Sequence, residues 1–478
     1  MILNLIPLLP EIFLCICAMG LLIVGVSFGN ESTKVVSWFS ALAVFITLVI
    51  VLLTPSGNNV LSLNGFFKLD VYASIFKAII LIGAIFSIAL SVRYLILQGI
   101  ARFEYPILIL LSVVGMMIMV SANNLLSLYV GLELQSLALY VLAAFNRNSL
   151  RSSEAGVKYF VLGALSSGLL LFGISLVYGF TGSIDFAVLD KSLWAAESVN
   201  FGVIFGLVFI LSGLAFKVSA VPFHMWTPDV YQGAPASVTA FFAMVPKVAA
   251  IGLLMRLLFE PFGALMEQWE QIVYFLSAAS MIVGAFAALA QENIKRMLAY
   301  SSIGNMGYAL MGVVAGNEYG VAAVILYIFI YMMMTAGVFA VVLTMRRHEH
   351  QLEKISDLSG LSKNSPWLAY CMAILMFSLA GIPPFAGFFG KLSVFAATVD
   401  AGYYFLAILG VLTSVIGAFY YLRIIKVMFF DEAEDSYDPV FPMARKVVLT
   451  ISILFVVCFA LKPGIIYVIT ETAAESLF

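Results

Sequence analysis

The sequence predicts an all-α polytopic membrane protein with about 14 transmembrane helices. The chain has 478 residues, of which 63% are apolar and 10% charged, and its mean hydropathy is +1.08. Soluble proteins carry about 25% charged residues and under about 50% apolar ones, so this composition excludes a soluble enzyme. The apolar runs are continuous rather than alternating, which favours helices over a β-barrel. A net charge of −2 gives no reason to expect nucleic acid as a partner.

Fourteen apolar segments are long enough to cross a hydrocarbon core about 30 Å thick, which takes roughly 20 helical residues. They cover residues 5–27, 34–54, 70–96, 106–122, 124–145, 156–180, 201–229, 233–259, 271–290, 294–316, 319–345, 366–399, 402–428 and 443–470.

Basic residues are distributed unevenly between the two ends of these segments. If the N-terminus faces outward, the inner loops hold 16 Lys and Arg residues and the outer segments hold four. The positive-inside rule then predicts that both termini lie on the outer side. In this count Arg256 belongs to an outer segment and Arg445 to an inner loop.

Two of the segments are too long and too rich in Pro and Gly to be single helices. Residues 201–229 would span over about 40 Å as one helix, at about 1.5 Å per residue. They contain Lys217, Pro222 and His224, and residues 366–399 contain the run Gly381–Gly387 followed by Lys391. Proline removes a backbone hydrogen bond, so we expect a break in each segment. Non-helical backbone at membrane depth is tolerated only where it is buried in protein or lines a water-filled cavity.

The two breaks lie five segments apart, which indicates an internal repeat. Because five is an odd number, the two five-helix units must cross the membrane in opposite directions, an arrangement typical of ion-translocating transporters. We expect an N-terminal three-helix segment (1–105), a first repeat (106–260), a second, inverted repeat (271–430) and a C-terminal loop with the last helix (431–478). Gly and Pro are also common in ordinary transmembrane helices, but the lysine near each break favours the repeat.

Four ionisable residues inside the predicted spans are candidates for proton transfer: Glu133, Lys217, Lys247 and Lys391. A charge at the bilayer centre costs at least roughly 2.5–3.5 kcal/mol, so these residues must pair or work together. Desolvation favours the neutral amine of a lysine, whereas a carboxylate about 4 Å away favours the ammonium by about 4 kcal/mol. A lysine that gains or loses the Glu133 carboxylate could therefore take up or release a proton. Arginine could not, because it does not deprotonate.

Other polar residues within the spans have plainer interpretations. Lys77 lies near the end of a span, and we expect it to extend its ammonium to water in a structural role. His224 is either a proton relay beside the first break or a packed neutral histidine. The four cysteines lie in apolar runs, and two of only three histidines, His348 and His350, share one loop. We therefore expect no metal site, haem or other redox centre on this chain.

The motifs around these residues resemble a known family. Residues 216–235, FKVSAVPFHMWTPDVYQGAP, are similar to the seventh and eighth helices of the antiporter-like subunits of respiratory complex I. The segments Gly131–Leu134, Leu298–Gly304 and Gly381–Lys391 fit the same pattern, so the resemblance covers essentially the whole chain. Within that family, Val230–Pro235 and Gly390-Lys391-Leu392 look most like the N-type subunits of the bacterial NADH-quinone oxidoreductase. M-type subunits would have Glu where Lys391 stands.

The resemblance implies a membrane-arm subunit that translocates protons with the energy released when NADH reduces quinone. Glu133 and Lys217 would form the switchable pair, Lys247 would be the central carrier, and His224 would help to connect Lys217 with Lys247. Lys391 would lie in the half that faces the next pumping subunit or the outward exit.

The resemblance also implies partners and a location. NADH, FMN, iron–sulfur clusters and quinone would bind to partner subunits rather than to this chain. The neighbours would be an antiporter-like M subunit and small subunits such as K and J, in the inner membrane of a bacterium.

Two other functions remain open at this point. One is a subunit of a multi-subunit cation/proton antiporter, which shares the fold. The other is a structural membrane subunit whose buried charges only lock helices together.

Overall fold

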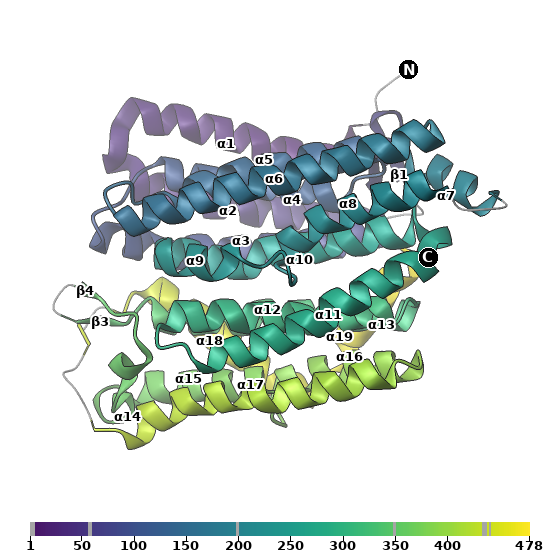
Figure 1. The fold of residues 1–478 in the computed structure, drawn as a ribbon. Coiled ribbons are helices and arrows are strands. Elements are labelled where there is room, and N and C mark those ends of the chain that lie inside the picture. Colours follow the sequence, from purple (N-terminus) through teal and green to yellow (C-terminus); the bar gives the residue numbers. More distant parts are fainter. Residues whose placement is uncertain (1–4, 56–59, 197–199, 348–349, 433–436, 439–440) are drawn as a thin grey trace.

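The structure is a computed structural model that describes residues 5–55, 60–196, 200–347, 350–432, 437–438 and 441–478. It is a bundle of helices that lie side by side, with the N-terminal half stacked above the C-terminal half in Figure 1. The β-structure in the described residues is limited to two antiparallel pairs, β1 (Val60–Ser62) with β2 (Phe67–Leu69) and β3 (Arg346–Arg347) with β4 (His350–Gln351). His350 lies in β4, and His348 lies outside the described residues.

The described residues of the N-terminal half form ten α-helices. They are α1 (Leu9–Phe28), α2 (Thr33–Leu53), α3 (Val71–Leu97), α4 (Glu104–Val120), α5 (Leu125–Ala143), α6 (Leu150–Thr181), α7 (Phe186–Trp194), α8 (Phe201–Val218), α9 (Trp226–Gly233) and α10 (Ala236–Phe259).

Nine α-helices follow in the part of the C-terminal half that the structure describes. They are α11 (Met266–Leu289), α12 (Ile294–Val314), α13 (Glu318–Val342), α14 (Leu361–Asn364), α15 (Pro366–Ala380), α16 (Ala386–Asp400), α17 (Tyr404–Phe430), α18 (Met443–Cys458) and α19 (Gly464–Glu475).

The all-α polytopic fold predicted from the sequence is confirmed, and each predicted span coincides with one helix or with a broken pair. Among the described residues, ten stretches are long and apolar enough to cross a membrane, and one of them, Ile6–Leu53, contains both α1 and α2. The helices α4 and α15 are apolar but shorter. The segment 294–316 forms α12, which is missing from those ten stretches because it carries many polar residues.

Both predicted breaks are present. The segment 201–229 divides into α8 and α9, and the segment 366–399 divides into α15 and α16. In Figure 1, α8 leads to α9 from right to left, whereas α15 leads to α16 from left to right, so the two broken helices run in opposite directions. The packing within the two repeats also corresponds. The first two helices contact each other in each repeat, α4 with α5 and α11 with α12. The helix before each break also contacts the broken helix, α6 with α8 in the first repeat and α13 with α15 and α16 in the second.

A third break was not predicted. The segment 443–470 divides into α18 and α19, because Pro463 has no backbone N–H to continue the helix. The short helix α19 then packs against α13 and α3. The sequence analysis therefore treated the last segment wrongly as a single helix.

The centre of the bundle is formed by α10 and α13, which contact each other. Every residue of α10 from Ala236 to Leu258 is buried. Outer helices such as α2, α6 and α17 instead expose large apolar side chains, including Phe45, Phe172 and Phe419. A water-soluble monomer does not expose so many, so these faces belong against lipid or other subunits.

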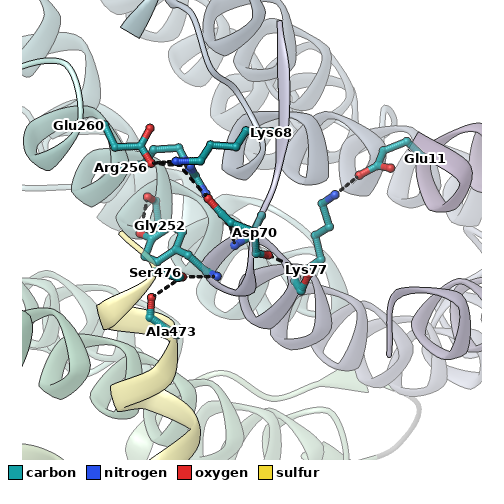
Figure 2. Close-up of polar contacts among 12 residues, drawn as sticks. Glu11, Lys68, Asp70, Lys77, Gly252, Arg256, Glu260, Ala473 and Ser476 are labelled. Atoms are coloured by element: carbon teal, nitrogen blue, oxygen red, sulfur yellow. Dashed lines mark hydrogen bonds and ion pairs between the residues drawn. The ribbon is translucent and has the colours of Figure 1, made fainter. Parts of the chain in front are cut away.

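A network of buried charges joins α3 and α10 at one end of the bundle (Figure 2). Both oxygens of Asp70, which caps the N-terminus of α3, accept hydrogen bonds from Arg256 Nη2 at 2.8 and 2.9 Å. Arg256 Nη1 donates to Glu260 at 2.7 Å, and Lys68 donates to the same carboxylate oxygen at 2.9 Å. The C-terminal segment joins this region, since the backbone N–H of Tyr72 donates to Ser476 Oγ at 2.9 Å.

Arg256, in the last turn of α10, and Arg445, at the start of α18, are both buried within the protein. The expectation for Lys77 is wrong. Lys77 does not reach water, because Glu11 on α1 lies 2.7 Å from its ammonium and both side chains are buried. A nearby carboxylate, rather than solvent, compensates the charge of Lys77 (Figure 2).

We predict that Arg256→Met destabilises the protein strongly. The substitution leaves the Asp70 carboxylate buried without its main partner, and breaking a buried ion pair in this way costs about 3–5 kcal/mol. The melting temperature and the amount of protein in the membrane should both fall. Arg147→Met, at an exposed loop position, is the matched control and should change neither. Equal melting temperatures for the two variants would contradict the prediction.

Candidate functional site

The first break is stabilised by side chains that form hydrogen bonds at the C-terminal end of α8. After Val218 the chain turns through Ser219, which has a left-handed backbone with φ of +65°. Trp226 Nε1 donates to the carbonyl oxygen of Phe216 at 2.9 Å, and Thr227 Oγ1 donates to Ser219 Oγ at 2.7 Å. The last carbonyls of a helix have no partners within the helix and must be satisfied by other groups, so these contacts stabilise the interruption.

Lys247 of α10 supplies the cation at this carbonyl end. Its ammonium donates to the carbonyl oxygen of Val218 at 3.0 Å and to Ser219 Oγ, and it lies 5.5 Å from the centre of the Trp226 ring. The side chain is buried, and no carboxylate in the described part of the chain lies within 4.0 Å of it. Because the C-terminal end of a helix carries a partial negative charge, the end of α8 stabilises the ammonium without neutralising it.

Lys217 points to the other side of α8, toward α5. Its ammonium donates to Ser136 Oγ at 2.7 Å and to the hydroxyl of Tyr140 at 3.4 Å. Glu133 lies on the same face of α5, three residues before Ser136, and among the described residues its Oε1 is buried without a hydrogen-bond partner.

The direct Glu133–Lys217 ion pair that the sequence analysis expected is not formed in this structure. No contact within 4.0 Å joins these two side chains. The physical reason is the register of α5 against α8, which places Ser136, one turn beyond Glu133, at the ammonium of Lys217.

The second break repeats the arrangement of the first. The helix α15 ends at Ala380, and Gly381 follows with φ of +85°. Lys391 of α16 donates to the carbonyl oxygen of Ala380 at 3.2 Å and to Ser414 Oγ at 2.9 Å, and it lies 5.1 Å from the centre of the Tyr308 ring. Each half-helix C-terminus thus binds one buried lysine, which comes from α10 at the first break and from α16 at the second.

His224 lies between the two halves of the first broken helix. It is half-buried, and its Nδ1 has no hydrogen-bond partner among the described residues. The structure does not bring it into hydrogen-bond contact with Lys217 or Lys247, whose polar contacts are to other residues. The relay role of His224 stays a prediction.

A network of hydroxyl and amide groups next to Lys391 was missed by the sequence analysis. Tyr327 donates to Asn305 Oδ1 at 2.6 Å, Asn305 donates to the Ser301 carbonyl at 2.9 Å, and Ser301 Oγ lies 2.5 Å from the Tyr421 hydroxyl. The ring of Tyr308, beside Lys391, is 6.5 Å from that of Tyr327. The signal was present in α12, where Ser301, Asn305 and Tyr308 recur at helical spacing on one face.

This arrangement is suited to moving protons. Hydroxyl groups both donate and accept hydrogen bonds, so they can pass a proton on without changing charge. The buried lysines are held by neutral oxygens, which bind either the ammonium or, less tightly, the amine. The four cysteines are free, and among the described residues no group of three or more His, Cys, Asp or Glu side chains could hold a metal ion.

Comparison with known proteins identifies the family. Residues 122–417 match the family model described as NADH:quinone oxidoreductase/Mrp antiporter, TM. The NADH-quinone oxidoreductase subunit N of Parvibaculum lavamentivorans is 52% identical over 471 residues, which is 98% of this chain and 97% of that protein. The subunit N of Rhodospirillum rubrum is 50% identical over 98% of this chain and 97% of that protein. The chain belongs to the subunit N family.

Solved structures agree with this membership of the subunit N family. A chain of respiratory complex I from Thermus thermophilus with bound Aureothin superposes with a TM-score of 0.81 at 32% identity, over 96% of this chain and 98% of that one. A chain of the Mrp complex from a Dietzia species has a TM-score of 0.87 at 24% identity, over 99% and 98% of the two chains. The second likeness shows a shared fold alone.

We predict that Gly387→Ala disrupts the second break. A Cβ at this position in α16 would overlap the carbonyl oxygen of Ser378 in α15, so the two half-helices must move apart. Overpacking of this kind costs about 1–3 kcal/mol and displaces Lys391 from Ala380. Thermal stability in detergent should fall. Gly168→Ala in α6 meets no atom within 4 Å and is the control, so a similar loss there would contradict the prediction.

Proposed function

We propose that this chain is a proton-translocating membrane subunit of an NADH-quinone oxidoreductase. In this role it couples electron transfer from NADH to quinone, on other subunits, to proton movement across the membrane. The relatives that carry the name of this enzyme's subunit N are about 50% identical over nearly the whole chain, for example 52% over 98% of it. The Thermus thermophilus complex I chain, at 32% identity, supports the same assignment.

The observation that carries the mechanism is the pair of lysines at half-helix C-termini. Lys247 and Lys391 are buried and bonded to the carbonyl oxygens of Val218 and Ala380. An amine held by neutral oxygens can bind and release a proton, whereas a guanidinium cannot deprotonate. We propose that Lys217, Lys247 and Lys391 carry the proton in turn.

Glu133 and His224 complete the proposed route. The Glu133 carboxylate, with its unpartnered oxygen, would take the place of Ser136 as the partner of Lys217 in another state of the cycle. Gaining or losing this contact would change the proton affinity of Lys217. His224, in the loop of the first break, would connect Lys217 with Lys247 or with water.

The partners of the chain would be other membrane subunits of the same complex. An antiporter-like M subunit and small subunits such as K and J would cover part of the apolar surface of α2, α6 and α17, and lipid would cover the rest. We further propose that the chain lies in a bacterial inner membrane with both termini on the periplasmic side, as the uneven distribution of basic residues favours.

The redox cofactors would bind to partner subunits. For an iron–sulfur cluster, the described part of this chain gathers no group of three or more His, Cys, Asp or Glu side chains. Its cysteines lie apart, with Cys15 and Cys17 in α1, Cys371 in α15 and Cys458 in α18. An iron–sulfur cluster needs several thiolates at one site.

The alternative, a subunit of a cation/proton antiporter, rests on weaker similarity. The Dietzia Mrp chain is 24% identical, against about 50% for the oxidoreductase subunits, for example 50% for that of Rhodospirillum rubrum. The oxidoreductase is therefore the better-supported function.

We predict that Lys247→Met abolishes coupled proton movement through this subunit while the complex still assembles. The thioether fills a similar volume but binds no proton. NADH-driven proton uptake by membrane vesicles should fall at least tenfold relative to the parent, measured beside the NADH oxidation rate. Lys217→Met and Glu133→Gln should lower uptake in the same direction.

The matched control is the double variant Lys77→Met with Glu11→Leu, which removes a buried lysine together with its carboxylate partner. It should keep normal proton uptake if assembled. Loss of assembly in Lys247→Met with normal uptake per assembled complex would mean that the buried charges only lock helices together.

We predict that Lys247→Arg also stops proton uptake, although it keeps the positive charge and can still donate to Val218. A guanidinium stays protonated at every physiological pH, so the carrier could be loaded but not emptied. Vesicle uptake measured between pH 6 and 9 should stay low throughout. Activity that recovers at high pH would contradict a carrier role for Lys247.

A further inference from the structure

A charged pocket of about 860 Å³ opens at the end of the bundle where α9 ends. In Figure 1 this is the left-hand end, which also carries β3, β4 and α14. Its wall includes the backbone of Gly233, Ala234 and Pro235, where α9 passes into α10. The charged side chains that line it are Arg151, Glu292, Lys295, Arg296, Glu353, Lys354 and Asp357.

Lys295 lies buried in the wall of this pocket, in an unfavourable place for a cation. It is the second residue of α12, and the N-terminal end of a helix carries a partial positive charge. Two contacts compensate for this. Its ammonium lies 2.5 Å from Glu353 Oε1, and it donates to the carbonyl oxygen of Ala234, beyond the end of α9, at 3.1 Å.

Glu353 is positioned by its own surroundings. Asn293 Nδ2 donates to its Oε2 at 3.1 Å, and the N–H of Ile294 donates to its backbone carbonyl at 2.8 Å. Lys295 therefore joins the start of α12, the loop before α14 and the end of α9 at one point. The neighbouring Arg296 also holds α9, through Asp229 at 2.8 Å.

Behind Lys295 lie the buried hydroxyls of Tyr231 and Ser302, which form no hydrogen bond of good geometry with the described residues although they lie near each other. Ser302 is seven residues after Lys295, on the same face of α12 and about 10 Å deeper, at 1.5 Å per residue. Tyr231 precedes Ala234 by one turn on α9, and its hydroxyl lies near Ser302. The ring of Tyr231 is 6.4 Å from that of Trp226, above which the Lys247 ammonium sits.

We propose that this pocket is the mouth through which protons from the aqueous side reach Lys247, and that the Lys295–Glu353 ion pair is its gate. The proposal rests on the proposed proton-translocating function. While the Lys295–Glu353 ion pair is formed, this pair and the end of α9 close the inner end of the pocket and keep water away from Tyr231 and Ser302. When the pair separates, Lys295 loses its main partner, and the hydroxyls of Tyr231 and Ser302 become accessible to water.

Thiol labelling tests the gate without any turnover of the enzyme. Ser302→Cys in the full complex in membrane vesicles is treated, from the side of the pocket, with a small membrane-impermeant methanethiosulfonate cation. Modification is measured by mass spectrometry of the peptide that contains position 302, so the native cysteines do not interfere. We expect little modification with Glu353 present and at least tenfold faster modification when Glu353→Gln is added.

The matched control is Glu292→Gln, which removes the same charge from the same pocket at an exposed residue that forms no ion pair with Lys295. Position 302 should stay protected in this control. Equal modification rates with Glu353→Gln and Glu292→Gln would overturn the gate. If Glu353→Gln does not assemble, Glu353→Asp is used instead, because it shortens the reach of the carboxylate by one methylene. We again expect faster modification of position 302, and a rate equal to that of Glu292→Gln would overturn the gate.

Proton uptake separates this inference from the function on which it rests. Normal uptake in Lys247→Met overturns the proposed function whatever happens at position 302. Reduced uptake in Lys247→Met together with unchanged labelling of position 302 overturns the gate alone.

Discussion

A buried ammonium in a membrane protein needs oxygen atoms around it, and here the interruption of a helix supplies them. The carbonyl ends of α8 and α15 would be unsatisfied if they met only apolar side chains. Lys247 and Lys391 donate hydrogen bonds to these carbonyl oxygens. The partial negative charge at the end of each helix in turn offsets the cost of burying the ammonium. The left-handed turns at Ser219 and Gly381 follow from this requirement, because each helix must stop at the depth of its lysine.

Buried cationic side chains serve two purposes in this bundle, and the groups that bind each side chain decide which purpose it serves. Lys77 is paired with the Glu11 carboxylate, and Arg256 with Asp70, so each of these buried cations has an anionic partner, and the contacts hold helices together. Lys247 and Lys391 are instead bound by neutral carbonyl and hydroxyl oxygens. Neutral partners leave both protonation states within reach, which a carboxylate at contact distance does not. The bundle therefore separates the buried cations that are paired with carboxylates from those that are bound by neutral oxygens.

Much of this could be predicted from the sequence, because the signals are local. Long apolar runs gave the spans, and Pro222 and the Gly381–Gly387 run gave the two breaks. Pro463 carried the same signal, and the third break was missed because the surrounding apolar run was read as continuous. The partners of the buried charges could not be predicted in this way. Asp70 and Arg256 are 186 residues apart in the chain, and whether Ser136 or Glu133 meets Lys217 depends on a register between α5 and α8.

The polarity of α12 has a consequence for how this helix is stabilised in the bilayer. This helix starts with Lys295 and Arg296 at the end of the bundle and brings Asn305 and several serines and tyrosines to membrane depth, and most of its surface is covered by other helices. A segment with so many polar groups does not partition into lipid by its own hydrophobicity. It packs closely against α11 through Gly284 and Gly304, so neighbouring helices rather than lipid cover its polar groups. The stability of this helix in the bilayer thus depends on the rest of the bundle.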